Sequence, residues 1–326
     1  LLYTSEKQTH EKDIIHIKGL TDNIETFLDY AVSLNYQLSI HPDIISSIQA
    51  SHPDWESRND RYVKTYDTDG ELRPTSGLPL LVEMQQRYGF VELFFVQDAA
   101  GNQVARSFGM IGRRGDRWWY KRFIADADNR PFISKSYYSM TGNIPVASIF
   151  HPIIKDGTLI GIMGTDINFH HLQEIVEGYL RADDMYAIVL DSEGSIIAHP
   201  NTEKIDELYN LKTLTRHVLK NKGEEVLQST QGYHETEVVR LDWAPEIAKA
   251  ANSAVQGESG YYKQIGVEGM ESSLYYEPIQ LSSSGNSEEY FAVLLVHDTS
   301  AVVLAKKVIS IATSIFIILV ILGLFL

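Results

Sequence analysis

The stretch Leu93-Phe-Phe-Val-Gln-Asp98-Ala-Ala-Gly101-Asn-Gln-Val-Ala105 recurs in the chain as Tyr186-Ala-Ile-Val-Leu-Asp191-Ser-Glu-Gly194-Ser-Ile-Ile-Ala198. In both copies a hydrophobic run ends at an aspartate, a glycine turn follows and a second hydrophobic run begins, which is typical of two strands joined by a tight turn. Downstream, Ile149-Phe-His-Pro152-Ile is echoed by Tyr275-Tyr-Glu-Pro278-Ile, and the predicted strand 158–167 by 290–297. Recurrence in the same order predicts two related modules in tandem.

The first copy belongs to a longer series of predicted elements. Strands are expected at 90–97, 104–108, 132–139, 146–154 and 158–167. A short helix is expected at 118–127, and another after Asn168, whose side chain can cap it. The sequence therefore predicts an α+β fold, with a five-stranded antiparallel sheet in this module and helices on one side of it.

Before the strands, apolar residues repeat at helical spacing. One series recurs every seven positions and a second lies between its members: Ile17, Ile24, Ala31 and Leu38, and Leu20, Phe27 and Leu34. An a/d stripe over about three heptads predicts one long helix. The stripe fits two structures equally well, a helix packed on the protein's own sheets and the seam of a dimer.

The C-terminal residues Val308–Leu326 carry no charge. A helix of this length nearly spans a hydrocarbon core of about 30 Å, so a transmembrane helix is predicted. The alternative, a buried core helix, rarely has an uninterrupted apolar run. Lys306 and Lys307 can snorkel to either side, so charge leaves the orientation open. The expected parts are 1–55 (long helix), 56–182 (first module), 183–300 (second module) and 301–326 (transmembrane helix).

Composition excludes several classes of function. The chain has 28 basic and 43 acidic residues, a net charge of -15, which argues against nucleic-acid binding. With no cysteine it has no disulfide, thiolate zinc site or cysteine nucleophile. His170, His171 and Glu174 supply too few ligands for a closed metal site, and no catalytic or phosphate-binding motif is present. We expect no metal, no cofactor and no enzymatic activity.

One set of residues has the chemistry of a small binding site. Arg117, Trp119 and Tyr120 lie at the start of a predicted helix, Tyr137 on a predicted strand and Asp166 at the end of another. Arginine can hold a carboxylate through two parallel hydrogen bonds, and an aspartate flanked by aromatic faces suits an ammonium group. The set therefore matches a zwitterion such as a free amino acid.

Each of these residues also has a structural interpretation. Trp119 and Tyr120 are of types that commonly fill cores, and Asp166 could cap the helix that follows it. Tyr137 and Tyr138 are adjacent on one strand, so their rings point to opposite faces and only one of them can face a pocket.

With two tandem sheets, a long N-terminal helix and a final membrane span, the chain resembles the double Cache sensor domain of bacterial chemoreceptors, sensor histidine kinases and cyclic-dinucleotide enzymes. The resemblance covers residues 10–326. It is most specific in 117–167, including Phe132-Ile-Ser-Lys-Ser-Tyr-Tyr-Ser139 and Gly161-Ile-Met-Gly-Thr-Asp-Ile167. It implies two PAS-like antiparallel-sheet modules, with the membrane-distal one first. It also implies a homodimer in the cell membrane, with residues 1 to about 305 extracytoplasmic.

The amino-acid-binding branch of that family carries an Arg-x-Trp-Tyr motif, a later tyrosine and an aspartate. The resemblance implies that Arg117, Trp119 and Tyr120 hold the ligand carboxylate, and that Asp166 with Tyr137, or Tyr138 in its place, holds the ammonium.

The chain also departs from that branch. It has Gly112 where a further tyrosine is common and Ser139 where an acidic residue can follow the strand tyrosine. Its second module lacks the motif, because Arg240-Leu-Asp-Trp243 has the wrong spacing. The resemblance implies the sensor region of a transmembrane receptor for a small zwitterion. The alternatives are a sensor of another amine or carboxylate and, from a different class, an extracytoplasmic enzyme or adhesion module.

Overall fold

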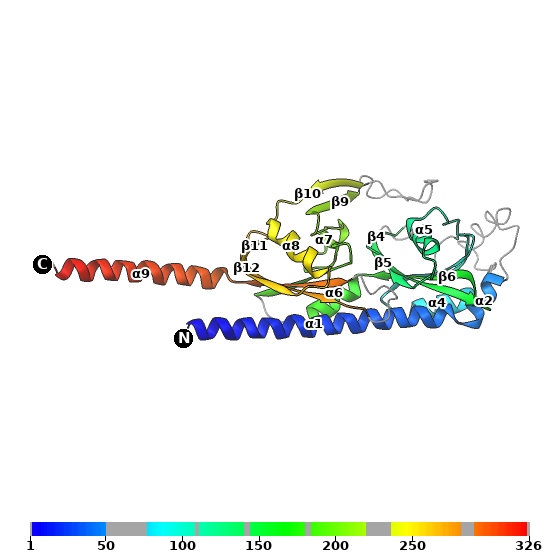
Figure 1. Ribbon diagram of the computed structural model, residues 1–326, viewed down its shortest axis with the longest axis horizontal. Helices are drawn as coiled ribbons and strands as arrows, with labels where there is room; N and C mark the ends of the chain where they lie inside the picture. Colours follow the sequence, from blue (N-terminus) through cyan, green and yellow to red (C-terminus); the bar gives the residue numbers. More distant parts are fainter. Residues whose placement is uncertain are drawn as a thin grey trace.

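The computed structural model describes residues 2–49, 77–107, 111–139, 144–179, 184–219, 236–281 and 290–324. The fold is α+β, as predicted. A long N-terminal helix, α1 (Leu2–Ser39), runs beneath two antiparallel sheets that follow one another along it, and the C-terminal helix α9 (Ser300–Leu324) leaves from the end where α1 begins (Figure 1). The predicted boundaries 55/56 and 182/183 lie outside the described residues.

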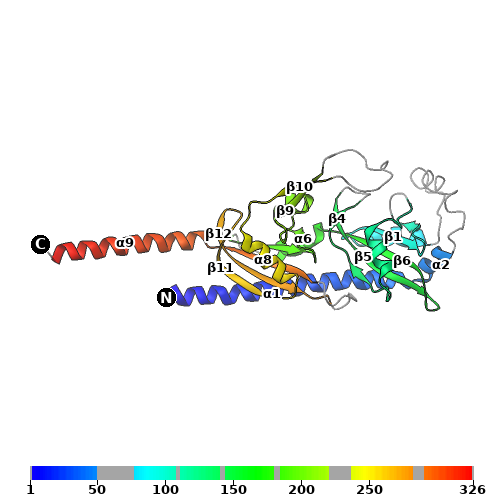
Figure 2. The ribbon, with the colours of Figure 1, turned by 45° about the horizontal axis from the view of Figure 1, so that its top comes forward.

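Helix α1 supports both sheets. Its 38 residues give a length of about 57 Å at 1.5 Å per residue, and it lies along both sheets in two views that differ by 45° (Figures 1 and 2). Every residue of the predicted a/d stripe is at most 8% exposed and belongs to the core that the helix shares with the sheets. Within one chain the stripe therefore packs on the protein's own sheets.

The first sheet has six strands in the order β2-β1-β6-β5-β3, with β4 paired to β5. The strands are β1 (Val91–Asp98), β2 (Gln103–Arg106), β3 (Phe132–Ile133), β4 (Tyr137–Tyr138), β5 (Pro145–Lys155) and β6 (Thr158–Asn168).

The predicted strand 132–139 is interrupted between β3 and β4. There the Ser148 N–H donates to the Ser134 Oγ at 2.8 Å instead of to a strand carbonyl. The Ser136 N–H donates to Asp191 Oδ2 of the second module at 2.7 Å. Side-chain acceptors thus replace ladder partners, and the prediction of five strands was wrong for this reason.

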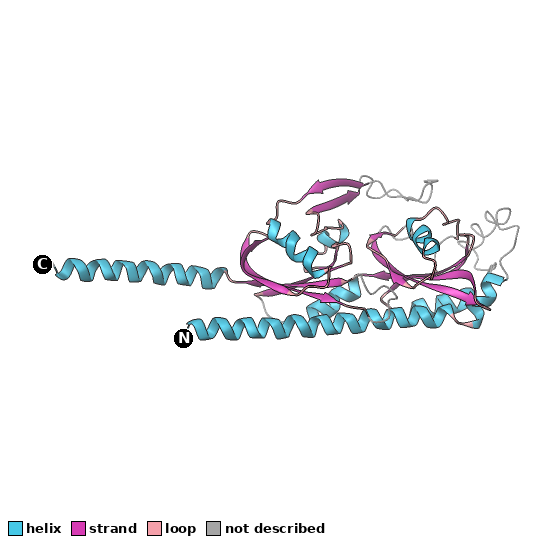
Figure 3. Cartoon of the chain, in the orientation of Figure 1, coloured by secondary structure: helices cyan, strands magenta, loops and turns pink. Residues whose placement is uncertain are grey.

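Helices cover both faces of this sheet, so the prediction of helices on one side was also wrong. Besides α1, the helices around it are α2 (Pro42–Gln49), α4 (Gly77–Arg87) and α5 (Trp118–Ala125), whereas α6 (His170–Tyr179), which follows β6, packs against α1 and the second sheet. Phe94 and Val96 of β1 share a core with α1, whereas Leu93 and Phe95 pack in a separate cluster with Phe123 of α5. Figure 3 shows α5 on the face opposite α1. Both sets of alternating β1 side chains are therefore buried.

A buried polar group links α1 to the underside of the same sheet. The Asn35 side chain donates to Thr165 Oγ1 at 2.7 Å, and its Oδ1 lies 2.6 Å from His151 Nδ1. Burial lowers the pKa of His151 to about 4, so the ring is neutral at pH 7 and can donate to the asparagine.

Asn168 does not cap the following helix. It is the last residue of β6, where its N–H donates to Phe90 O at 3.0 Å and its side-chain amide to Gly89 O at 3.1 Å. Pairing with the start of β1 keeps Asn168 in the sheet, and α6 begins only at His170.

The second sheet repeats the first. Its order β11-β12-β13-β7-β8 corresponds strand by strand to β3-β5-β6-β1-β2. Its strands are β7 (Met185–Leu190), β8 (Ile196–Ala198), β11 (Gly260–Val267), β12 (Met270–Ile279) and β13 (Phe291–Asp298). Helices α7 (Glu203–Asp206) and α8 (Pro245–Ala254) accompany it, together with a separate ribbon of β9 (Thr215–Leu219) and β10 (Thr236–Arg240). The predicted tandem repeat is confirmed.

The repeated turns also match atom by atom. Asp98 Oδ1 accepts the N–H groups of Ala100 and Asn102 at 2.9 and 2.8 Å. Asp191 Oδ1 accepts those of Glu193 and Ser195 at 3.0 and 2.8 Å. The glycines in the two turns have φ of 92° and 83°, a conformation that favours glycine.

Helix α9 is long and apolar enough to cross a membrane, and none of its stretch Ser300–Ile318 is buried against the rest of the described chain. A core helix would be covered by protein, so this finding agrees with the predicted membrane span.

The last strand before α9 is tied to α1 by a histidine. His297 Nδ1 lies 2.8 Å from the buried Asp13 carboxylate, and Nε2 lies 3.3 Å from that of Asp184. The hydrogen bond to Asp13 raises the pKa of His297, with burial opposing it and the charges of both aspartates adding to it.

Because the pKa of His297 is raised on folding, this bridge stabilises the protein fully below the unfolded pKa. The contribution is lost as pH rises through the folded pKa. At pH 5.5 we expect His297→Gln to lose about 1 kcal/mol in thermal denaturation, with a smaller loss at pH 9. The exposed His170→Gln is the control; an equal loss for His297→Gln at both pH values would contradict the assignment.

Candidate functional site

Arg117 lies at the N-terminus of α5 with extended backbone (φ -66°, ψ 141°). Its side chain is buried, and the guanidinium carbon is 5.9 Å from the centre of the Tyr137 ring. Arg106 and Arg114 are close by: burial, with the charges of Arg106 and Arg117, lowers the pKa of Arg114 to about 10. Three guanidinium groups beside a helix N-terminus make this end of the site favourable for an anion.

Asp166 forms the opposite end of the site. It lies on β6 directly across from Ser148 of β5, whose hydroxyl donates to its carboxylate, and Tyr137 OH donates to it at 3.4 Å. Asp166 is 4% exposed and, among the residues that the structure describes, forms no ion pair. Burial raises its pKa to about 6, against the opposing hydrogen bond from Ser148. An ionised carboxylate here has hydroxyl partners but no salt-bridged cation.

Tyr137 connects the two ends. Its hydroxyl lies 2.6 Å from Ser148 Oγ, and burial together with the charge of Asp166 raises its pKa, so it stays neutral. The structure thus brings together three of the predicted residues, Arg117, Tyr137 and Asp166. Ser148, which sequence reasoning missed, is a fourth member. Its only sequence signal is its position on the strand expected to pair with 158–167.

Trp119 and Tyr120 hold α5 in place. The Trp119 ring stacks on Phe150 at 4.7 Å and is 3% exposed. Tyr120 OH donates to Ala99 O at 2.8 Å, which fixes the start of α5 against the β1–β2 turn. Both residues thus have the packing role that the sequence offered as the alternative, and whether they also contact a ligand stays a prediction.

Tyr138 faces the second module. Its hydroxyl donates to the carbonyls of Asp206 at 2.6 Å and His217 at 3.1 Å. Adjacent strand residues point to opposite faces, and of the two tyrosines it is Tyr137 that lies beside Asp166.

A cavity of about 500 Å³ lies where the two modules meet. Its lining includes Arg117, Tyr137 and Tyr138 from the first module, and Asn210, Thr215 and His217 from the second. Both tyrosines border this cavity because it lies between the modules, so the expectation that only one of them can face a pocket was wrong. Asp166 does not line this cavity itself, but it accepts a hydrogen bond from the hydroxyl of Tyr137, which does. The sequence analysis predicted none of these second-module residues. They are about 80 positions from Tyr137 and Tyr138, and a local sequence pattern cannot predict a contact over that separation.

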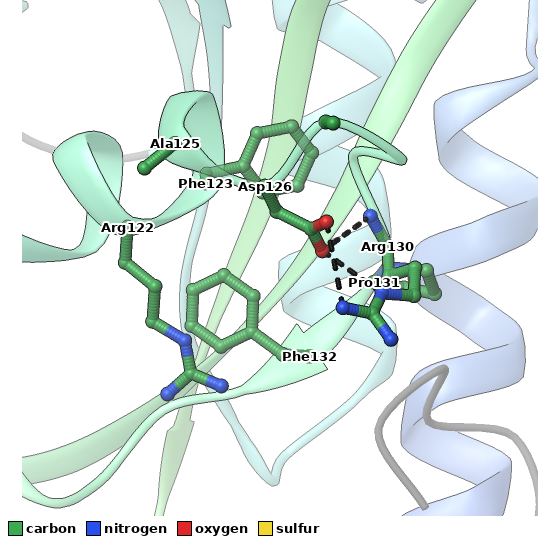
Figure 4. Close-up of a pocket in the computed structure, with 8 residues that line it drawn as sticks. Arg122, Phe123, Ala125, Asp126, Arg130, Pro131 and Phe132 are labelled. Atoms are coloured by element: carbon green, nitrogen blue, oxygen red, sulfur yellow. Dashed lines mark hydrogen bonds and ion pairs between the residues drawn. The ribbon is translucent and has the colours of Figure 1, made fainter.

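A smaller cavity of about 330 Å³ lies at the other end of α5 (Figure 4). There Asp126 pairs with Arg130 at 3.0 Å, and the Arg122 guanidinium lies 4.1 Å from the centre of the Phe132 ring. It contains none of the predicted site residues, and its charged groups already have partners within the cavity. The larger cavity is therefore the better candidate.

The described residues contain no group of three or more His, Asp or Glu side chains placed to hold a metal ion. His170 and Glu174 form an exposed pair at 3.4 Å on α6.

Two sheets with the same strand order on one supporting helix, followed by a helix long enough to cross a membrane, define a tandem two-module domain. The family model of the Cache domain (dCache_1) matches residues 4–305, and the chain belongs to this family. Cache domains are extracytoplasmic ligand-binding sensors, and the fold is the double Cache fold.

Solved structures share the fold. The ligand-binding domain of the Pseudomonas aeruginosa amino-acid chemoreceptor PctB in complex with L-Arg has a TM-score of 0.54 and 13% identity, covering 91% of this chain and 97% of that one. The ligand-binding domain of the Pseudomonas fluorescens chemoreceptor CtaA with L-isoleucine gives 0.51 and 15%, covering 91% and 96%. The extracellular domain of a putative histidine kinase, mmHK1S-Z2, gives 0.53 and 13%, covering 89% and 97%. No curated protein matches the sequence.

The packing role of Trp119 predicts a large loss of stability on truncation. Removing a buried, stacked indole costs roughly 3–5 kcal/mol, so we expect that loss for Trp119→Ala. Its half-buried neighbour is the matched control, and Trp118→Ala should lose clearly less. Chemical denaturation of both variants measures the difference; equal losses would show that Trp119 is not a core residue.

Proposed function

We propose that this Cache sensor region binds a free amino acid in the first module, with the α-carboxylate at Arg117 and the α-ammonium at Asp166. The buried Asp166 carboxylate carries the proposal. Among the described residues it has hydroxyl partners and the nearby charge of Arg106 but no ion pair, and an ammonium group would supply a directly bound cation.

The opposite end of the site favours a negative charge. Burial, together with the charges of Arg106 and Arg117, lowers the pKa of Arg114, so three guanidinium groups lie close together at this end. A zwitterion satisfies both ends at once, whereas a plain amine or a plain carboxylate satisfies one. The structures with L-Arg and L-isoleucine bound to the same fold support this proposal.

We assign the predicted site residues different tasks. Arg117, Tyr137 and Asp166 contact the ligand, while Trp119 and Tyr120 set the position of α5 and contribute to the carboxylate end through Arg117. Tyr138 joins the first module to the second through its hydrogen bonds to Asp206 and His217.

Signalling requires that the ligand prefers one of two states of the sensor. In our proposal the closed first module shifts the second, and the shift reaches α9 through β12 and β13. Thr299, next to the start of α9, donates its N–H to Glu271 O of β12 at 2.9 Å. Residues 1 to about 305 would lie outside the membrane. Homodimerisation stays a prediction, and the a/d stripe, being buried within one chain, is not available for it.

A panel of amino acids tests the proposal by thermal shift. A ligand at 100 times its Kd should stabilise the protein by about 2.7 kcal/mol. We expect Arg117→Ala and Asp166→Asn to abolish the shift. Arg130→Ala, which removes an exposed ion pair in the same module, should keep it.

Other outcomes have distinct meanings. Loss of binding in Arg117→Ala alone indicates a plain anion, and loss in Asp166→Asn alone an amine. An unchanged shift in both variants refutes the site.

The raised pKa of Asp166 predicts a pH dependence of binding. The free carboxyl titrates at about 6. The ammonium binds its ionised form, so affinity is full above this pH and should fall about tenfold between pH 7 and pH 5. In the free protein the sign is opposite: a carboxyl with a raised pKa contributes stability at low pH that is lost as pH rises through about 6. Calorimetric titration at the two pH values measures the effect; constant affinity would contradict it.

A further inference from the structure

The wall that the second module gives to the 500 Å³ cavity is rich in hydroxyl and amide groups. Its described members are Ser195, Asn210, Thr213, Thr215, His217 and Thr236, with Glu193 and Leu208. It faces the Tyr137 side of the proposed amino-acid site.

Hydrogen bonds within the wall fix its geometry. Asn210 Oδ1 accepts from the N–H and hydroxyl of Thr213, both at 3.0 Å, and Asn210 Nδ2 donates to Glu193 O at 2.8 Å. The Thr213 and Thr215 hydroxyls lie 2.6 Å apart. Thr215 is the first residue of β9, which pairs with β10. Such groups are preorganised to meet a polar partner.

The wall is joined to the first module directly beside the proposed ligand contacts. Tyr138, next to Tyr137, donates to His217 O, and Ser136 donates its N–H to the buried Asp191 carboxylate. A ligand that reaches the wall therefore touches both modules across a joint that already exists.

A positively charged side chain, that of Lys135, also lines this cavity. Its Nζ lies 5.3 Å from the centre of the Trp118 ring, and it forms no ion pair among the described residues. Burial and the charge of Lys135 lower the pKa of His217, which is therefore neutral at pH 7. Glu193, the one acidic residue among the described residues of the lining, has Lys212 Nζ at 3.9 Å.

We propose that the cavity receives the side chain of the amino-acid ligand, and that the second-module wall selects a side chain ending in a carboxylate or carboxamide. This inference rests on the proposed function. A branched aliphatic side chain would displace water from the hydroxyl and amide groups without replacing its hydrogen bonds, which costs affinity. A carboxylate or carboxamide replaces those bonds and lies near Lys135.

The test is calorimetric titration of the full chain in detergent with two sets of amino acids. One set is aspartate, glutamate, asparagine and glutamine, and the other is valine, leucine and isoleucine. We expect the best polar ligand to bind at least about tenfold tighter than any aliphatic one, the factor expected from one or two hydrogen bonds.

Thr213→Val and Thr215→Val remove a wall hydroxyl with little change of volume and should reduce this preference several-fold. Thr202→Val is the matched control, since Thr202 belongs to the same module, lies outside the lining and makes no side-chain cap. Lys135→Gln distinguishes a carboxylate from a carboxamide at the end of the ligand side chain. It should lower the affinity for aspartate and glutamate and leave that for asparagine and glutamine unchanged. Thermal denaturation of each variant confirms folding.

Two results overturn the inference while the proposed function stands: aliphatic ligands that bind as tightly as polar ones, or an unchanged ranking in both threonine variants. In either case Arg117→Ala would still abolish binding. If no amino acid binds the unaltered chain, the proposed function itself fails.

Discussion

Burial of one face of α1 is the constraint on which the rest of the structure depends. The stripe from Ile17 to Leu38 packs under both sheets, so strands as far apart in sequence as β1 and β13 share a single hydrophobic core. Among the described residues, the cores of the two modules that face α1 are continuous, and the separate cluster of the first module lies on the opposite face of its sheet, against α5. A displacement of one module would change the packing of α1 and through it that of the other module, as the proposed signalling from a site in the first module to α9 requires.

The candidate site exploits the opposite face of the first sheet. There the aromatic cluster around Trp119 and Phe150 excludes water, and at its edge stands Asp166 with hydroxyl partners. A carboxylate in such surroundings is costly to ionise, and its raised pKa expresses that cost. Thr165, the residue before it, faces α1 and accepts a hydrogen bond from Asn35. One strand thus presents a candidate-site residue and a residue that contacts α1 at consecutive positions.

The sequence allowed prediction of what is local. The tandem repeat, the aspartate–glycine turns and the long helix follow from residue types at short spacing. Arg117, Tyr137 and Asp166 are further apart, and their side-chain chemistry and the family resemblance predict them as one candidate site. The break between β3 and β4 could not be predicted, because its cause is the Asp191 carboxylate 55 positions later. Burial of both sheet faces by α5 and the second-module lining of the cavity depend on tertiary contacts in the same way. Asn168 has a good capping side chain, but pairing with β1 decides its conformation.

The two matching turns differ at one position that changes what each can do. In the first, Asn102 donates its side-chain amide to Asp98 Oδ2, so both carboxylate oxygens serve their own turn. In the second, Ser195 occupies the corresponding place and Asp191 Oδ2 accepts the Ser136 N–H instead. If the modules arose by duplication, replacement of one amide side chain would have freed an acceptor in one copy. The second module could then bind the first through Asp191, while Asp98 of the first module makes no equivalent contact among the described residues. This asymmetry distinguishes the membrane-distal module from the membrane-proximal one.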